Sequence, residues 1–216
     1  MLLPRPVDRS HTSFPHSPDL RFFCKETEVR NSTASLRQSV GRGLRVLNVG
    51  GRHGEQNHWF PEDSTVVVLD LPGSSRIANS ITGDICAEAI AVEDEYDVVF
   101  SHEVFEHLYR PWIAARHCLR LCRPGGLNIH IAPFSWRYHP VPLDCFRYSH
   151  SGFESLFQQL GEVDILVSGY DITDRRGGAA TQHGFWDNGR DHPPADQVGG
   201  WLENWDTILI VRRPTA

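Results

Sequence analysis

The stretch that most constrains the fold runs from residue 44 to residue 55 and reads LRVLNVGGRHGE. Its first half alternates apolar side chains, and Gly50 and Gly51 follow directly. This pattern predicts a buried strand that turns sharply at the glycines, with Gly54 ahead of a helix start. Glycine tolerates positive φ and lets a ligand approach the backbone closely, as in the nucleotide-binding corners of α/β folds. The stretch alone fits such a corner and an ordinary strand–turn–helix connection equally well.

Strands and helices alternate after this corner. Six further segments are typical of strands: 65–69, 80–82, 96–101, 127–132, 163–167 and 207–211. Two are typical of amphipathic helices: 111–121, and a segment that Ser149 or Ser151 caps and that continues to Leu160. This alternation predicts an α/β domain with a mainly parallel sheet and helices on both faces.

The composition fits one soluble globular domain. Of the 216 residues, 40% are apolar and 22% are charged. We expect an N-terminal arm with short helices over residues 1–43 and the main domain over residues 44–216. Within that domain, a long loop at about 170–205 is rich in Gly, Asp and Pro and carries tryptophans.

Charge, hydropathy and cysteine content exclude several classes of protein. The net charge of −6 argues against a nucleic-acid partner, and no apolar run of about 18 residues predicts a membrane span. The N-terminus lacks the apolar core of a secretory signal, and the five cysteines are an odd, scattered set. We therefore expect a cytoplasmic protein with reduced thiols.

Acidic residues follow two of the predicted strands, where ligands bind in a doubly wound sheet. Asp70 lies about 20 residues past the glycine turn, the spacing of a carboxylate that accepts hydrogen bonds from a ribose diol. Asp84 can accept from an adenine amino group while Ile85 packs on the ring; a turn or a helix cap is the alternative for either aspartate. No GKS or GKT sequence is present, so a triphosphate ligand is not expected.

Several motifs, in order, resemble those of class I S-adenosylmethionine-dependent methyltransferases. Residues 46–54 are similar to the family's VLDVGCGTG turn, residues 96–107 (YDVVFSHEVFEH) to its FDVVxSxxVxEH segment, and residues 120–126 (RLCRPGG) to its R-x-L-K-P-G-G turn. Residues 139–149 resemble an H-x-x-P-x-D-x-x-R-Y-T pattern of a type 11-like subgroup that acts on small molecules or glycans.

The resemblance implies a Rossmann-like, mainly parallel seven-stranded sheet whose last strand is antiparallel, and S-adenosylmethionine as the cofactor. Two positions depart from the pattern: Asn48 replaces an acidic residue, and Arg52 replaces the middle glycine. Asn48 still offers an acceptor oxygen without a charge. Arg52 can pair with the cofactor carboxylate or block the pocket. The predicted cofactor-binding residues are Asn48, Gly50, Gly51, Arg52, Asp70, Leu71, Asp84, Ile85, Ser101, His102 and Glu103.

Histidines are the natural bases for taking a proton from a methyl acceptor near neutral pH. His107 and His139 are the candidates, although the family's Glu-His pair is largely architectural, and Asp144 lies in the same loop as His139. We predict His107, His139 and Asp144 as catalytic residues, with His183 as a further candidate base. A divalent metal on His139, Asp144 and His183 is a weaker alternative, because no HxH or HxxxH pair occurs; no metal is predicted.

The sequence thus predicts methyl transfer from S-adenosylmethionine to a small-molecule or sugar-type acceptor, at oxygen. One alternative is a methyltransferase-like fold that binds the cofactor or a partner without transferring methyl, or that uses the pocket for another reaction. A nicotinamide-dependent dehydrogenase ranks last, because it leaves two segments unexplained: residues 96–107, called the EH segment after Glu106 and His107, and the RPGG turn at residues 123–126. The tryptophans at 170–205 would form either a lid over the acceptor or the contact of a homodimer.

Overall fold

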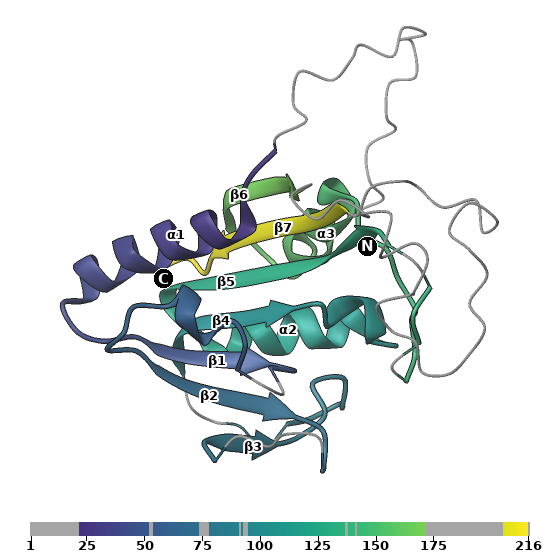
Figure 1. Ribbon diagram of the computed structural model, residues 1–216, viewed down its shortest axis with the longest axis horizontal. Helices are drawn as coiled ribbons and strands as arrows, with labels where there is room; N and C mark the ends of the chain where they lie inside the picture. The colour runs from purple at the N-terminus through teal and green to yellow at the C-terminus, as the bar shows by residue number, and fades with distance from the viewer. Residues whose placement is uncertain are drawn as a thin grey trace, which may run out of the picture.

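The computed structural model describes residues 22–51, 54–73, 78–90, 92, 95–136, 138–140, 142–171 and 205–215. Seven strands form one sheet (Figure 1): β1 (Arg45–Val49), β2 (Thr65–Asp70), β3 (Ser80–Thr82), β4 (Tyr96–His102), β5 (Cys122–Ser135), β6 (Asp164–Asp171) and β7 (Trp205–Arg212). The helices are α1 (Lys25–Val40), α2 (Pro111–Leu121) and α3 (His150–Gln158), and two short 3-10 turns are η1 (Asn57–Trp59) and η2 (Phe105–His107).

The strand order is β3-β2-β1-β4-β5-β7-β6. Neighbouring strands from β3 to β5 pair in parallel, and β7 lies antiparallel between β5 and β6. The predicted Rossmann-like sheet with an antiparallel last strand is confirmed. The order reverses direction between β1 and β4, and in open α/β sheets ligands bind beyond the carboxyl ends of the strands at such a point.

Helices cover both faces of the sheet, as predicted. The α2 and α3 side is filled by one apolar cluster that includes Ala114, Cys118, Phe153 and Phe157. The other cluster places Val29 and Leu36 of α1 over β1, β4 and β5 (Figure 1). Pro at the first position of α2 has no amide hydrogen to lose there, and the Ser149 hydroxyl caps α3 by accepting from the Gly152 amide.

The sequence allows a helix start after Gly54 but only a short first helix, because Pro61 interrupts it. Among the described residues between β1 and β2, the single turn η1 is the only helical element. Trp59 and Phe60 cover this part of the sheet instead, with their rings edge-on to Phe100 at 6.0 and 5.2 Å. Trp59 and Phe60 thus bury this part of the sheet on the α1 side, where no described helix covers it.

Two boundaries also differ from the predicted ones. Strand β5 begins at Cys122, directly after α2, and Gly125 adopts a φ of 73° within it. The region 21–40 contains the single helix α1, where the sequence indicated one or two short helices. Residues 1–21 of the predicted N-terminal region and most of the 170–205 loop lie outside the described residues. Within the described ranges, no helix combines the length and the apolar character needed to cross a membrane.

Candidate active site

The glycine corner lies at the carboxyl end of β1, beside β4. Gly50 has a φ of 72° and donates its amide hydrogen to the Leu69 carbonyl at 2.8 Å. A Cβ at position 50 would come within 2.6 Å of the Val104 side chain, which follows β4. Glycine is therefore required both by the backbone angle and by the close passage of the next strand's loop.

Asn48 lies directly beneath the second glycine. Its side chain is 1% exposed, and its Nδ2 finds no hydrogen-bond partner among the described residues. A Cβ at Gly51 would stand 2.1 Å from that nitrogen. Asn48 thus fixes the need for glycine at position 51, and a buried amide donor remains at the corner. Arg52 lies outside the described residues, so its predicted role stays a prediction.

Asp70 ends β2, the neighbour of β1. Its Oδ1 accepts a hydrogen bond from the Leu71 amide at 2.8 Å, whereas its Oδ2 is buried without a partner in the described part of the chain. A buried carboxylate oxygen that lacks a donor is costly, and a ribose hydroxyl would satisfy it. The side chain of Leu71 beside it is 44% exposed and offers an apolar surface to a ligand.

Asp84 and Ile85 follow β3 at the same edge of the sheet. The Asp84 carboxylate accepts from the Cys86 amide at 2.8 Å and from the Tyr109 hydroxyl at 3.2 Å. Ile85 packs into the apolar core. Asp84 therefore caps its own turn, the alternative that the sequence left open, and Tyr109 joins the edge without a sequence motif to signal it.

The end of β4 brings three predicted residues to the corner. The buried Ser101 hydroxyl pairs with His130 Nδ1 at 2.8 Å, so its contribution to a ligand would come from the backbone. Glu103 has a φ of 53°, an uncommon conformation for a residue with a side chain. Burial, with a smaller effect from Lys25, lowers the pKa of His102 to about 3, so this imidazole is neutral at physiological pH.

A further cluster at this edge was missed from the sequence. Lys25 Nζ lies 2.5 Å from Asp206 Oδ2, and the Lys25 backbone amide donates to Asp171 Oδ2 at 2.9 Å. One nitrogen or oxygen atom that could bind a metal ion, from each of His102, Glu103 and Asp206, lies within 4.8 Å of the other two. Asp171 ends β6, so a search for acidic residues at the carboxyl ends of the strands would have found it. No sequence pattern indicated that Lys25 lies beside it.

The predicted catalytic residues His107, His139 and Asp144 lie together next to this corner. The rings of His107 and His139 are 5.0 Å apart, and His139 Nδ1 lies 3.5 Å from Asp144 Oδ2. Arg147 binds both oxygens of Asp144. Although burial raises the pKa of Asp144, hydrogen bonds from Arg147 and from the His139 amide bring it below its usual value. Asp144 is therefore a carboxylate at physiological pH.

Glu106 belongs to the Glu-His pair that the resemblance describes as largely architectural, and it lies near both histidines. Its side chain is fully buried, and its backbone carbonyl accepts from the amides of Cys145 and Phe146 at 2.6 and 3.1 Å. Burial, followed by the charges of Glu103 and Asp206, raises the pKa of Glu106 well above its usual value. The backbone bonds tie η2 to the loop after β5, which is how residues over 30 positions apart meet.

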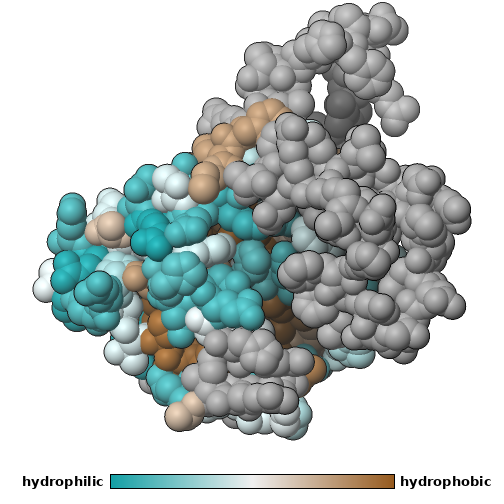
Figure 2. Space-filling model, in the orientation of Figure 1, coloured by the Kyte–Doolittle hydropathy of each residue, from teal (hydrophilic) through white to brown (hydrophobic). Residues whose placement is uncertain are grey.

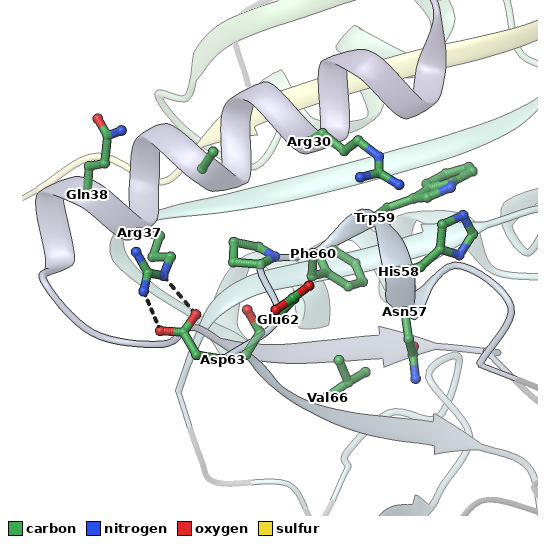
Figure 3. A pocket seen from close by; sticks show the side chains of 13 residues that line it. Arg30, Arg37, Gln38, Asn57, His58, Trp59, Phe60, Glu62, Asp63 and Val66 are labelled. Atoms are coloured by element: carbon green, nitrogen blue, oxygen red, sulfur yellow. Dashed lines mark hydrogen bonds and ion pairs between the residues drawn. The ribbon is translucent and has the colours of Figure 1, made fainter.

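The described residues also form a hollow of about 1080 Å³ away from this edge. Its walls come from α1 and from the segment between η1 and β2, and none of the predicted site residues lines it. Figure 3 shows the Arg37–Asp63 ion pair closing one end of this hollow, which we call the α1 hollow. In Figure 2, hydrophilic side chains cover much of the described surface on this side, with apolar atoms visible between them. The α1 hollow is therefore not the predicted active site.

The residues at the carboxyl edge fit S-adenosylmethionine. Asp70 presents a buried oxygen with no described partner, Asn48 presents a buried amide, and Leu71 provides exposed apolar surface. The glycine corner brings backbone close to the same point. Such groups match a ribose diol, a polar amino-acid end and an adenine ring.

Comparisons with known proteins agree with this assignment. The family model described as a methyltransferase domain (Methyltransf_11) matches residues 47–129. No significant match was found among curated proteins. The YcgJ protein of Bacillus subtilis is similar in structure, with a TM-score of 0.58 and 13% identity over 88% of this chain and 100% of its own.

Two other solved structures show how varied proteins with this fold are. The 1,6-didemethyltoxoflavin-N1-methyltransferase of Burkholderia thailandensis, solved with 1,6-didemethyltoxoflavin and S-adenosylhomocysteine, has a TM-score of 0.54, 14% identity, and coverage of 88% and 79%. The [4+2]-cyclase SpnF has a TM-score of 0.54, 17% identity, and coverage of 87% and 81%. At these identities the likeness extends to the fold. Together, the family model over residues 47–129 and the shared fold show a methyltransferase domain of the S-adenosylmethionine-dependent class, with S-adenosylmethionine as its cofactor.

Proposed function

We propose that the chain methylates a hydroxyl oxygen of a small-molecule or sugar-type acceptor. The observation that carries this proposal is the pair of imidazoles His107 and His139, whose rings lie edge-on with centroids 5.0 Å apart; His107 lies three residues after Val104, whose side chain adjoins Gly50. A hydroxyl must lose its proton as it takes up a methyl group, and a neutral imidazole is the side chain best suited to accept it.

Neighbouring groups set the protonation state of His107 and the orientation of His139. Burial lowers the pKa of His107, which keeps the ring neutral at physiological pH. Asp144, held by Arg147, lies behind His139 and can fix the orientation of its ring. In this proposal His107 or His139 takes the acceptor proton, and Asp144 positions His139.

The cofactor-binding role is assigned to the corner and the neighbouring strand ends. S-adenosylmethionine, when bound, supplies a methyl group activated by its sulfonium. Asp70 would hold the ribose, Leu71 and Ile85 would adjoin the adenine, and Asn48 with Gly50 and Gly51 would line the other end. Ser101, His102, Glu103 and Asp84 would complete the surroundings through backbone atoms and turns.

Methyl transfer from isotope-labelled S-adenosylmethionine to sugars, nucleotide sugars, phenols and amines would test the proposal. We expect labelled O-methyl product with a hydroxyl acceptor. His139→Gln should lower kcat about 100-fold, with S-adenosylhomocysteine affinity retained. The matched control is His58→Gln, an exposed histidine on η1 that should leave kcat unchanged.

Two outcomes would contradict the proposal. Transfer to an amine or thiol alone would remove the assignment to oxygen. Binding of S-adenosylhomocysteine without turnover on any acceptor class would favour the alternative, a protein that uses the pocket for binding or for another reaction.

A further inference from the structure

Three side chains with metal-binding atoms converge beside the predicted acceptor site. Glu106 and His107 come from η2, and His139 comes from the segment after β5. Glu106 Oε1 lies 3.5 Å from His107 Nε2 and 3.9 Å from His139 Nε2. One donor atom from each of the three residues lies within 4.8 Å of the other two.

Glu106 lacks the partners that a buried carboxylate requires. Its side chain is fully buried, and neither oxygen accepts a hydrogen bond from another described residue. Buried carboxylates are ordinarily hydrogen-bonded, paired with a cation or bound to a metal, because isolation in a low-dielectric interior costs on the order of several kcal/mol. Glu106 therefore either stays protonated or binds a cation that no described residue supplies.

The orientation of His107 is suited to such a cation. Its Nδ1 lies 2.5 Å from the Leu143 carbonyl oxygen, which can only accept a hydrogen bond. Nδ1 therefore carries the ring proton, and Nε2 directs a lone pair toward Glu106. A carbonyl that holds Nδ1–H in this way is the usual support of a metal-binding imidazole.

His139 is held from behind by a carboxylate. Its Nδ1 lies 3.5 Å from Asp144 Oδ2, and Asp144 also accepts the His139 backbone amide at 2.7 Å. Arg147 fixes Asp144 in turn. This arrangement resembles a carboxylate–histidine–metal chain, with Asp144 supporting a ligand rather than being one. The sequence had grouped Asp144 with His139 and His183 as the metal alternative, and it predicted no metal.

We propose that Glu106 Oε1, His107 Nε2 and His139 Nε2 bind one divalent transition-metal ion of the zinc class. Two atoms each about 2.1 Å from a tetrahedral zinc ion lie about 3.4 Å apart, close to the spacings between Glu106 and the two histidines. Two imidazoles and one carboxylate form a donor set that suits Zn²⁺ and similar ions. Three protein ligands leave a coordination position for a further oxygen.

The metal site stands apart from the choice of methyl acceptor. Its consequence for catalysis, unlike the site itself, rests on the proposed methylation at oxygen. A metal ion bound here would occupy both imidazoles, and the acceptor hydroxyl would bind at the open position and become more acidic. In the metal-bound protein the histidines would act as ligands, in place of the role as bases proposed for the metal-free chain, and the proton of the more acidic hydroxyl would pass to solvent.

Metal titration of the full chain tests the site directly. After dialysis against a chelator, the wild-type protein should bind one Zn²⁺ per chain by calorimetry, and Co²⁺ should give the visible absorption of a tetrahedral site. Glu106→Gln and His139→Gln should each weaken Zn²⁺ binding at least 10-fold, whereas His58→Gln should bind as the wild type does. Far-ultraviolet circular dichroism and S-adenosylhomocysteine binding would show that each variant is folded.

Each outcome decides a different point. Absence of stoichiometric Zn²⁺ and Co²⁺ binding by the wild-type chain overturns the metal site, as does unchanged affinity in folded Glu106→Gln. The wild-type Co²⁺ spectrum decides the question even where a variant fails to fold. Metal binding without methyl transfer to any hydroxyl would leave the site standing and remove the proposed function. Methyl transfer to a hydroxyl by the metal-free protein would keep the proposed function and overturn only the catalytic role given to the metal.

Discussion

At the scale of single residues, the cofactor edge depends on side chains whose polar atoms the protein leaves unsatisfied. Asp70 is the clearest case, because one oxygen caps its own turn and the other is buried without a described partner. Asp84 also lies at the carboxyl end of a strand, two residues past β3, yet both of its oxygens have protein donors. Two aspartates that look alike in the sequence therefore differ in what they can offer a ligand.

Replacing Asp70 should test this difference. Asp70→Asn keeps the size of the side chain and removes the charge, so S-adenosylhomocysteine affinity should fall about 10-fold, the value of one charge-assisted hydrogen bond. Calorimetric titration measures the change. Asp164→Asn, an exposed aspartate at the start of β6, is the matched control and should leave the affinity unchanged. Equal S-adenosylhomocysteine affinities in the two variants would show that Asp70 does not bind the ribose.

At the scale of elements, β5 and α3 pack around a buried histidine that no motif indicated. His130 Nδ1 pairs with the Ser101 hydroxyl at 2.8 Å. Its ring stacks on Phe157 at 4.9 Å and also contacts Phe105 and Phe153. No charged side chain of the described residues faces it. Burial alone lowers the pKa of His130 from 6.5 to about 3.

This histidine should make the packing of β5 on α3 sensitive to acid. Below pH 6.5 the unfolded chain binds a proton at His130, whereas the folded chain does not until about pH 3. The unfolded state thus holds more protons in that window, so stability falls as the pH falls. Between pH 7 and pH 5 the loss from this residue should be about 2 kcal/mol.

Urea unfolding of wild type and His130→Phe at both pH values would measure this loss. The phenylalanine keeps the aromatic packing and cannot titrate, so the variant should lose about 2 kcal/mol less than the wild type over the same interval. An identical loss in both proteins would show that His130 is not the acid-sensitive group.

At the scale of the whole molecule, the two most specific motifs serve opposite edges of the sheet. The EH segment forms η2 at the carboxyl edge, whereas the RPGG turn lies where β4 begins. There the buried Asp97 accepts from Arg42 at 2.8 Å, from Arg123 at 2.6 Å and from the Arg45 amide at 2.8 Å. A Cβ at Gly126 would lie 2.7 Å from the Asp97 carbonyl oxygen.

Asp97 therefore joins β1, β4 and the start of β5 far from the site. Burial raises the pKa of Asp97, but the bonds from Arg42, the Arg45 amide and Arg123 outweigh that effect and lower it. The RPGG turn is a structural part of the family signature in this chain. Recognising the family from it said nothing about which residues hold the ligand.

Removing this charge should weaken the whole fold and spare the site. Asp97→Asn should cost about 2–4 kcal/mol, because charge-assisted bonds are lost and two arginines keep their charges. Urea unfolding gives the cost, and S-adenosylhomocysteine affinity should be unchanged. Glu95→Gln is the control: its exposed pair with Arg213, at 3.5 Å, should contribute less than about 0.5 kcal/mol. A cost as small for Asp97→Asn would contradict the structural role.

The sequence by itself determined the strands, the helices and the position of the glycine corner. Buried β-branched runs and amphipathic periods are local properties, and Gly50 is dictated by its own backbone angle and the strand beside it. The predicted bounds of α2 hold to the residue, since Pro111 starts it. The loss of a helix after the corner followed from Pro61 in the same local way.

Only the tertiary structure decided which polar groups meet. Glu106 reaches His139, and Lys25 reaches Asp206, through contacts between segments that the chain order keeps far apart. An aspartate after a strand keeps an oxygen available for a ligand only where no other element supplies a hydrogen-bond donor to it, as Asp70 and Asp84 show. Local patterns specify elements, but partners and burial are properties of the packed molecule, because water is removed and charges are paired only on folding.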